Sequence, residues 1–120
     1  MVEFSIVAFL LLVMVFGMVD YSRYFLIRAN LTNAARDGAR YGATLTQSSA
    51  DQTLIQNHTS ALIHSNPSGI VPQVSFPTNG TVSRVRVEIN AFPFTPATFL
   101  VIKQAKTISV HAEFRRELQP

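Results

Sequence analysis

The chain begins with its most apolar stretch, and a more polar one follows it without a helix-breaking signal. Residues 4–19 contain no charged side chain, and the residues from there to Ala43 include no proline. Helix propensities summed over such a window favour one continuous helix from Glu3 to Ala43. About forty residues at ~1.5 Å each give a rod of roughly 60 Å, twice the thickness of a bilayer core. The pattern therefore predicts a rod whose first half suits lipid and whose second half suits water or protein.

The apolar half of this rod carries large side chains all around the helix. Its uncharged run spans ~24 Å, slightly less than a bilayer core. Tyr21, Tyr24 and Phe25 would extend it as an interfacial aromatic belt, and Arg23 and Arg28 can snorkel. A removable signal peptide is not expected, because a basic n-region and an A-x-A cleavage site are both missing. The apolar residues predicted to bury in lipid or among other helices are Phe4, Ile6, Val7, Phe9, Leu10, Leu11, Val13, Met14 and Phe16.

Charged residues flank the apolar run. A carboxylate that enters hydrocarbon costs a few kcal/mol, so Glu3 either faces water at the headgroup level or finds a partner charge on another subunit. Asp20 and Arg23 are three residues apart and can form an ion pair at the membrane interface. The basic residues lie only on the C-terminal side, a bias that by itself would place the rest of the chain in the cytoplasm.

Small residues recur at spacings of three and four along the second half of the rod. Such a track lets another backbone approach closely. The approaching element is either the chain's own folded part or a neighbouring helix, and the two contacts are compatible along different parts of the rod. This small-residue stripe consists of Ala34, Ala35, Gly38, Ala39 and Gly42.

After a polar linker that starts at Thr44, the pattern predicts a short helix over residues 51–65, capped by Ser49 or Asp51. Residues 99–102 predict a second short helix that caps the core, or else a contact with a subunit or a membrane. The rest of the chain alternates with period two, and Asn79-Gly80 predicts a hairpin turn. The residues expected to point inward are Val85, Val87, Ile89, Ala91, Ile108, Val110, Ala112 and Phe114; those expected to point outward include Arg84, Arg86, Glu88, Asn90 and Glu113.

The alternation predicts one half-buried antiparallel sheet of three or more strands. The second half of the long helix is the only element long enough to cover its apolar face. We therefore predict an α+β fold in which residues 1–22 form a membrane or filament-core stalk. Residues 23–120, which include the second half of the long helix, form a globular head.

Composition and missing motifs argue against an enzyme. Ten Lys and Arg against seven Asp and Glu give a net charge of +3, and the arginines are scattered, so nucleic-acid binding is not expected. The chain has no cysteine, which excludes disulfides and thiolate chemistry. No phosphate-binding glycine loop, Ser-His-Asp set or metal-ligand spacing occurs. His58 and His64 have no acidic residue close in sequence and are interpreted as surface histidines. No metal and no cofactor are predicted.

Three blocks of the first third resemble the TadE-like segment of tight-adherence (Tad/Flp) pilus proteins, in the type IV pilin-like superfamily. The first is the Glu3-Phe4 pair with the Leu and Val run behind it. The second is the junction Gly17-x-x-Asp20-Tyr21-x-Arg23, and the third is the Ala-Ala-Arg-x-Gly-Ala-Arg-Tyr block over residues 34–41. Two positions depart from the family pattern: Phe9 lies where a proline is common, and the Glu is third rather than fifth.

The resemblance implies a prepilin-like precursor with a basic leader cut on the cytoplasmic face, which would place the head outside the inner membrane. The implied function is a structural subunit of a tight-adherence pilus, held in the inner membrane before assembly and in an extracellular filament afterwards. The implied partners are other pilin subunits, a prepilin peptidase and the inner-membrane assembly machinery. Glu3 would make a charge contact between subunits, with a neighbour's N-terminal amine as the hypothetical partner.

The alternative is a membrane-anchored periplasmic scaffold or binding module that does not polymerise. Proteins of this family are usually minor pseudopilins, and the residues leave open whether this chain is a major or a minor subunit.

Overall fold

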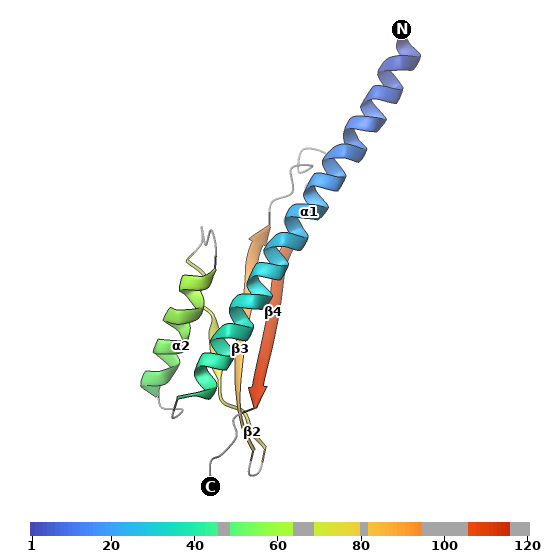
Figure 1. Cartoon of the computed structure of the whole chain (residues 1–120). Helices are drawn as coiled ribbons and strands as arrows, with labels where there is room; N and C mark the ends of the chain where they lie inside the picture. Colours follow the sequence, from blue (N-terminus) through green and yellow to red (C-terminus); the bar gives the residue numbers. More distant parts are fainter. Residues whose placement is uncertain (46–48, 64–68, 80–81, 95–105, 116–120) are drawn as a thin grey trace.

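A computed structural model describes residues 1–45, 49–63, 69–79, 82–94 and 106–115. In chain order the elements are α1 (Val2–Ala43), α2 (Ser49–Leu62), β1 (Gln73–Ser75), β2 (Thr78–Asn79), β3 (Val82–Phe94) and β4 (Lys106–Arg115). The molecule is elongated, 77 × 23 × 19 Å, because the first half of α1 projects far beyond the other elements (Figure 1). This arrangement confirms the predicted α+β fold.

Helix α1 is continuous over its 42 residues, as the sequence predicts. Its hydroxyl side chains return hydrogen bonds to the helix itself: Ser22 Oγ donates to the Met18 carbonyl at 3.0 Å, and Thr32 Oγ1 donates to the Arg28 carbonyl at 2.8 Å. Such bonds satisfy hydroxyl groups without water, which allows them inside a long helix. The helix ends where the Thr44 backbone N–H donates to the Tyr41 carbonyl at 3.1 Å and the Leu45 backbone N–H donates to the Gly42 carbonyl at 3.2 Å.

The sheet is built around β3. Strand β4 pairs antiparallel with it, with Val87 opposite Ala112, and the register shifts between Ile89 and Phe92. Strand β1 pairs antiparallel with the other edge of β3, with Val74 opposite Val87. Strand β2 pairs with the start of β3, which confirms the predicted hairpin; the turn residues 80 and 81 lie outside the described residues.

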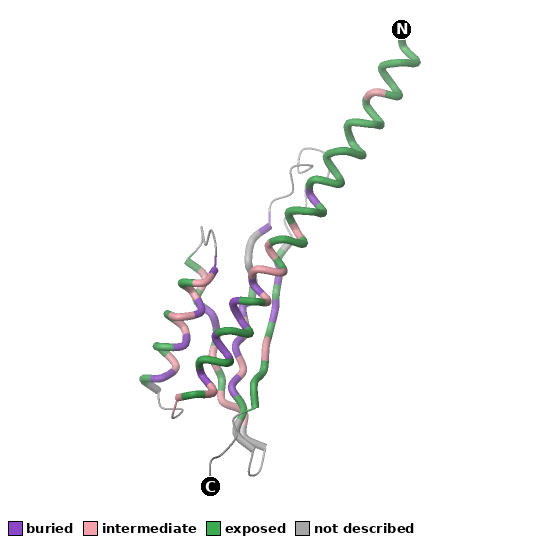
Figure 2. The backbone as a smooth tube through the Cα atoms, in the orientation of Figure 1, coloured by how far each residue is buried: buried purple, intermediate pink, exposed green. Residues whose placement is uncertain are grey.

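Both helices lie on one face of this sheet. The second half of α1 packs on β3 and β4, and α2 packs on α1 and β1, so that the long helix covers the apolar face as predicted (Figures 1 and 2). The buried apolar residues are Leu31, Ala34, Ala35 and Ala39 of α1, Ile55 of α2, Ile63 just after it, Val85, Val87, Ile89 and Phe94 of β3, and Ile108 and Val110 of β4.

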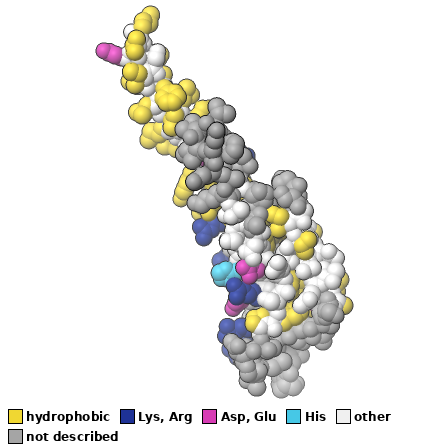
Figure 3. All heavy atoms as spheres, turned by 180° about the vertical axis from the view of Figure 1, so that it is seen from behind, with side chains coloured by type: hydrophobic (Ala, Val, Ile, Leu, Met, Phe, Trp, Pro, Cys, Tyr) yellow, Lys and Arg dark blue, Asp and Glu magenta, His cyan; other side chains and the backbone are white. Residues whose placement is uncertain are grey.

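The opposite face of the sheet is charged and partly exposed. Arg84 and Arg86 lie 3.8 and 3.6 Å from the carboxylate of Glu113, and Arg86 lies 3.8 Å from Glu88. Figure 3 shows acidic and basic side chains together on the molecule seen from behind. Exposed pairs of this kind contribute little to stability. The face is thus the solvated, mixed-charge surface that the alternation predicts.

Two local expectations were wrong, and three cannot be compared. Helix α2 begins at Ser49 and ends at Leu62, earlier at both ends than predicted, because Ala50 favours helix and Asp51 is favourable in a first turn. Phe114 is 43% exposed although it alternates with the inward residues. The predicted helix over 99–102 and His64 lie outside the described residues, and so does the side chain of Ala91.

Candidate assembly surface

The first nineteen residues of α1 find almost no cover in their own chain. The helix is long and apolar enough to cross a membrane by length and composition, and none of its most apolar window is buried, at a mean hydropathy of 2.6. Along α1 the first buried residue is Asp20. Figure 2 shows the same change from an exposed to a buried helix. The residues predicted for the membrane or filament core are 40–78% exposed: Phe4, Ile6, Val7, Phe9, Leu10, Leu11, Val13, Met14 and Phe16.

Exposed apolar side chains continue past Asp20, beside the head. Tyr21, Phe25 and Leu26 are 72%, 64% and 71% exposed, and we call this group the collar. Tyr24 does not belong to it. Its ring meets Phe94 of β3 edge-on, with 5.6 Å between ring centroids and 77° between planes. The predicted aromatic belt is therefore divided, because one of its rings belongs to the head.

The charged residues of the predicted site lie in three different environments. Glu3 is exposed on the projecting part of α1. Asp20 is 8% exposed and has an interaction partner. Arg23 is exposed on the surface of α1. Asp20 and Arg23, both described residues, form no ion pair with each other in this structure, so their pairing at a membrane interface remains a prediction.

The small-residue stripe is buried against the chain's own head. All five of its residues are buried, and a Cβ on Gly38 would overlap the side chain of Thr59 in α2. A Cβ on Gly42 would lie 2.7 Å from Ile55 Cδ1 and 2.8 Å from Val85 Cγ1. Of the two partners left open by the sequence, the head covers this stripe.

A polar contact that the sequence did not reveal ties α1 to α2. His58 Nε2 lies 3.0 Å from Asp37 Oδ2, and the His58 ring stacks on Tyr41 with 4.5 Å between centroids and 21° between planes. His58 is partly exposed, and although no acidic residue is close to it in sequence, the fold places Asp37 beside it. Asp37 is distant in sequence, and only the packing of the two helices brings the side chains together.

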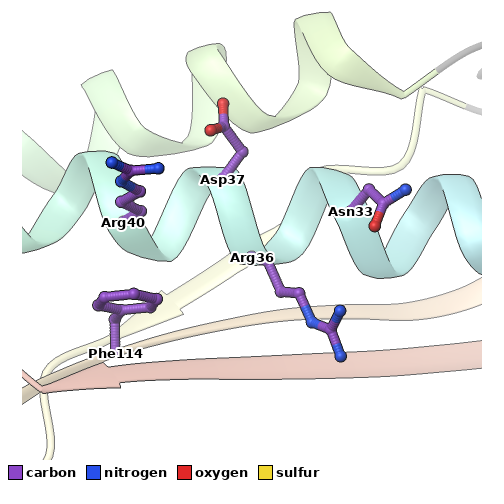
Figure 4. Close-up of a pocket in the computed structure, with 5 residues that line it drawn as sticks. All are labelled: Asn33, Arg36, Asp37, Arg40 and Phe114. Atoms are coloured by element: carbon purple, nitrogen blue, oxygen red, sulfur yellow. The ribbon is translucent and has the colours of Figure 1, made fainter.

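A shallow depression of about 420 Å³ lies between α1 and the end of β4. Asn33, Arg36, Asp37 and Arg40 line it from α1, and Phe114 lines it from β4 (Figure 4). Phe114 is exposed because polar and charged side chains of α1 border it here. In the part of the chain that the structure describes, no group of three or more His, Cys, Asp or Glu side chains could hold a metal ion.

Comparison with known families gives one match, over the part of the chain that carries the exposed surface. Residues 1–40 match the family model described as TadE-like protein. No curated protein and no solved structure matches the chain. The match spans the stalk, the collar and most of the small-residue stripe, and it confirms the resemblance seen in the sequence. The first third of this chain is therefore similar to TadE-like proteins.

Proposed function

We propose that this chain is a structural subunit of a bacterial tight-adherence pilus and that it assembles through its apolar N-terminal helix. The inner membrane holds this helix before assembly, with the head on the periplasmic side, and the filament holds it afterwards. Other pilin subunits, a prepilin peptidase and the inner-membrane assembly machinery are the partners. Two findings support the proposal: the TadE-like match and the exposure of the helix that the match covers.

The observation that carries the proposal is the apolar surface left uncovered by the chain's own fold. Burying a large apolar side chain is worth about 1.5–3 kcal/mol. Burial of the nine exposed residues that were predicted for the membrane or filament core is therefore worth on the order of 15–25 kcal/mol. Transfer of this surface from water to an apolar environment is therefore strongly favourable, by an amount as large as the net stability of a typical domain, about 5–15 kcal/mol. The surface needs lipid or other helices around it.

In a membrane anchor that does not polymerise, lipid alone covers this apolar surface. A pilus subunit must also leave the lipid when it enters the filament. The exchange of lipid for neighbouring apolar helices is nearly neutral in hydrophobic terms. Packing and polar contacts must then decide whether copies assemble. Glu3 is a candidate for such a contact, since a carboxylate beside hydrocarbon is costly until a partner charge neutralises it.

The test is production of the chain together with a tight-adherence assembly system, followed by isolation of surface filaments and detection of the chain in them by immunogold electron microscopy. The chain should appear in filaments, and Glu3→Ala should lower its incorporation about tenfold or more. Ser5→Ala is the matched control, since Ser5 lies in the same turn and its hydroxyl bonds only to the helix backbone. A chain that stays in the membrane as a monomer, with filaments free of it, would instead be a scaffold or binding module that does not polymerise.

A further inference from the structure

The described charged residues leave one exposed carboxylate without an ion pair. Asp37 pairs with His58, and Glu88 and Glu113 pair with arginines of β3. Glu3, on the projecting helix, has no ion-pair partner among the described residues. A bundle of stalks would bury this carboxylate, so its partner must come from another chain.

The collar supplies both an arginine and an apolar surface. Arg23 is exposed and forms no ion pair with a described residue, and it shares a helix face with Leu26, three residues further along. The collar thus combines exposed apolar side chains with the unpaired cation Arg23. The start of the stalk combines exposed apolar side chains with the unpaired anion Glu3. The two surfaces are complementary in charge and in polarity.

Helix geometry determines how two parallel copies must be offset for this match. Glu3 of one copy lies level with Arg23 of the next when the copies are shifted by 20 residues, about 30 Å along the axis. The same shift places Ile6 level with Leu26 of that neighbour, so the first turns of one stalk cover the other's collar. A pairing of Glu3 with Arg28 would instead need a shift of 25 residues, which places Ile6 level with Leu31, a residue buried in its own chain.

Two parallel copies packed without a shift would have their heads at the same level. Packed helices lie about 8–10 Å apart, whereas the molecule is 23 × 19 Å in cross-section. At zero shift several heads would compete for one level around the bundle. A shift of about 30 Å moves the heads to different levels.

We propose that a second copy of this chain docks on the collar, with Glu3 of one copy paired to Arg23 of the next in a parallel packing offset by about 20 residues. This inference rests on the proposed function and assigns one interface within the filament. Because the same pair of surfaces joins every successive copy, the contact is heterologous and can repeat along a filament.

Cysteine cross-linking tests this offset directly, because the natural chain has no cysteine. The double variant Ile6→Cys with Leu26→Cys, oxidised in cells that assemble filaments, should give a ladder of linked copies. The control pair Val13→Cys with Leu26→Cys has a different offset and should give no ladder. The single variants Ile6→Cys and Leu26→Cys measure the disulfides that form between the same position in two copies.

Charge variants in the same cysteine background test the ion pair. Glu3→Gln and Arg23→Gln should each lower the ladder yield about tenfold, the equivalent of losing a charge-assisted contact. The exchange Glu3→Arg with Arg23→Glu should restore the yield, because each copy then carries the pair in reverse. An unchanged ladder yield in both Glu3→Gln and Arg23→Gln would overturn the proposed ion pair.

The pattern of links separates failure of this interface from failure of the proposed function. Links confined to equal positions, in filaments that contain the chain, would overturn the offset and leave the pilus role intact. If no pair links and the chain is missing from filaments, the proposed function fails as well.

Discussion

At the scale of single residues, the glycines of α1 differ in how closely the head approaches them. Gly38 faces Thr59, whose side chain is fully buried and donates from Oγ1 to the Ile55 carbonyl at 2.8 Å, so it has little room to move. Gly42 faces the ends of the Ile55 and Val85 side chains. Gly17 has nothing within 4 Å.

These surroundings predict an order of stabilities for the three Gly→Ala variants. Alanine gains about 1 kcal/mol of helix propensity at each site. Overpacking costs typically 1–3 kcal/mol, so Gly38→Ala should lose about 1–2 kcal/mol net, and Gly42→Ala should lose less because side-chain ends can shift. Gly17→Ala is the control and should not lower the stability of the head. Thermal unfolding of the head in detergent, followed by circular dichroism, measures the order. A Gly38→Ala chain as stable as the Gly17→Ala chain would contradict it.

The same residues show what sequence can predict at this scale. Spacings of three and four identified Gly38 and Gly42 as close-packing positions, because that periodicity is a local property of the helix. The identity of their neighbours was not predictable, since Thr59 lies on a different helix. The contact of His58 with Asp37 could not be predicted for the same reason.

At the scale of elements, propensity and alternation were sufficient where they extended over many residues. The lack of proline and the steady supply of helix formers predicted α1 from end to end, and period-two alternation predicted β3 and β4. Helix α2 was located but its limits were wrong, because a single turn at each end has too few residues for periodicity to decide. The division of the aromatic belt depends on Phe94 of the sheet, which no pattern within α1 reveals.

The continuity of α1 between stalk and head leads to a prediction for Val19→Pro. Proline in a helix interior removes one backbone hydrogen bond and clashes with the carbonyl four residues earlier, at a cost of ~3 kcal/mol. Val19 is exposed, so the head should unfold at its usual temperature while the kinked rod no longer enters filaments. Val19→Ala is the matched control and should assemble normally. Electron micrographs of filaments, with thermal unfolding of the same proteins, measure both effects. Normal incorporation of the proline variant would show that a straight rod is not required.

At the scale of the whole molecule, the chain combines two parts that are stabilised in different surroundings. The second half of α1, the sheet and α2 bury an apolar core, whereas the apolar side chains of the first half of α1 are exposed. The sequence predicted this division from the position of its uncharged run. It could not predict which face of α1 the head would cover, because that depends on how the sheet and α2 come together.

This division predicts that residues 23–120 fold without the stalk. Apart from Asp20, every buried residue of α1 lies at Leu31 or beyond, so removal of residues 1–22 leaves the apolar core complete. The shortened chain should be monomeric in detergent-free buffer and unfold cooperatively, whereas the full chain should need detergent. A chain that starts at Arg36 is the control: it lacks Leu31, Ala34 and Ala35, and burial of side chains of this size is worth several kcal/mol, enough to unfold a small domain. Size-exclusion chromatography and circular dichroism distinguish the two. Aggregation of the 23–120 chain would show that the head needs the turn around Asp20, and it would move the boundary between stalk and head toward the N-terminus.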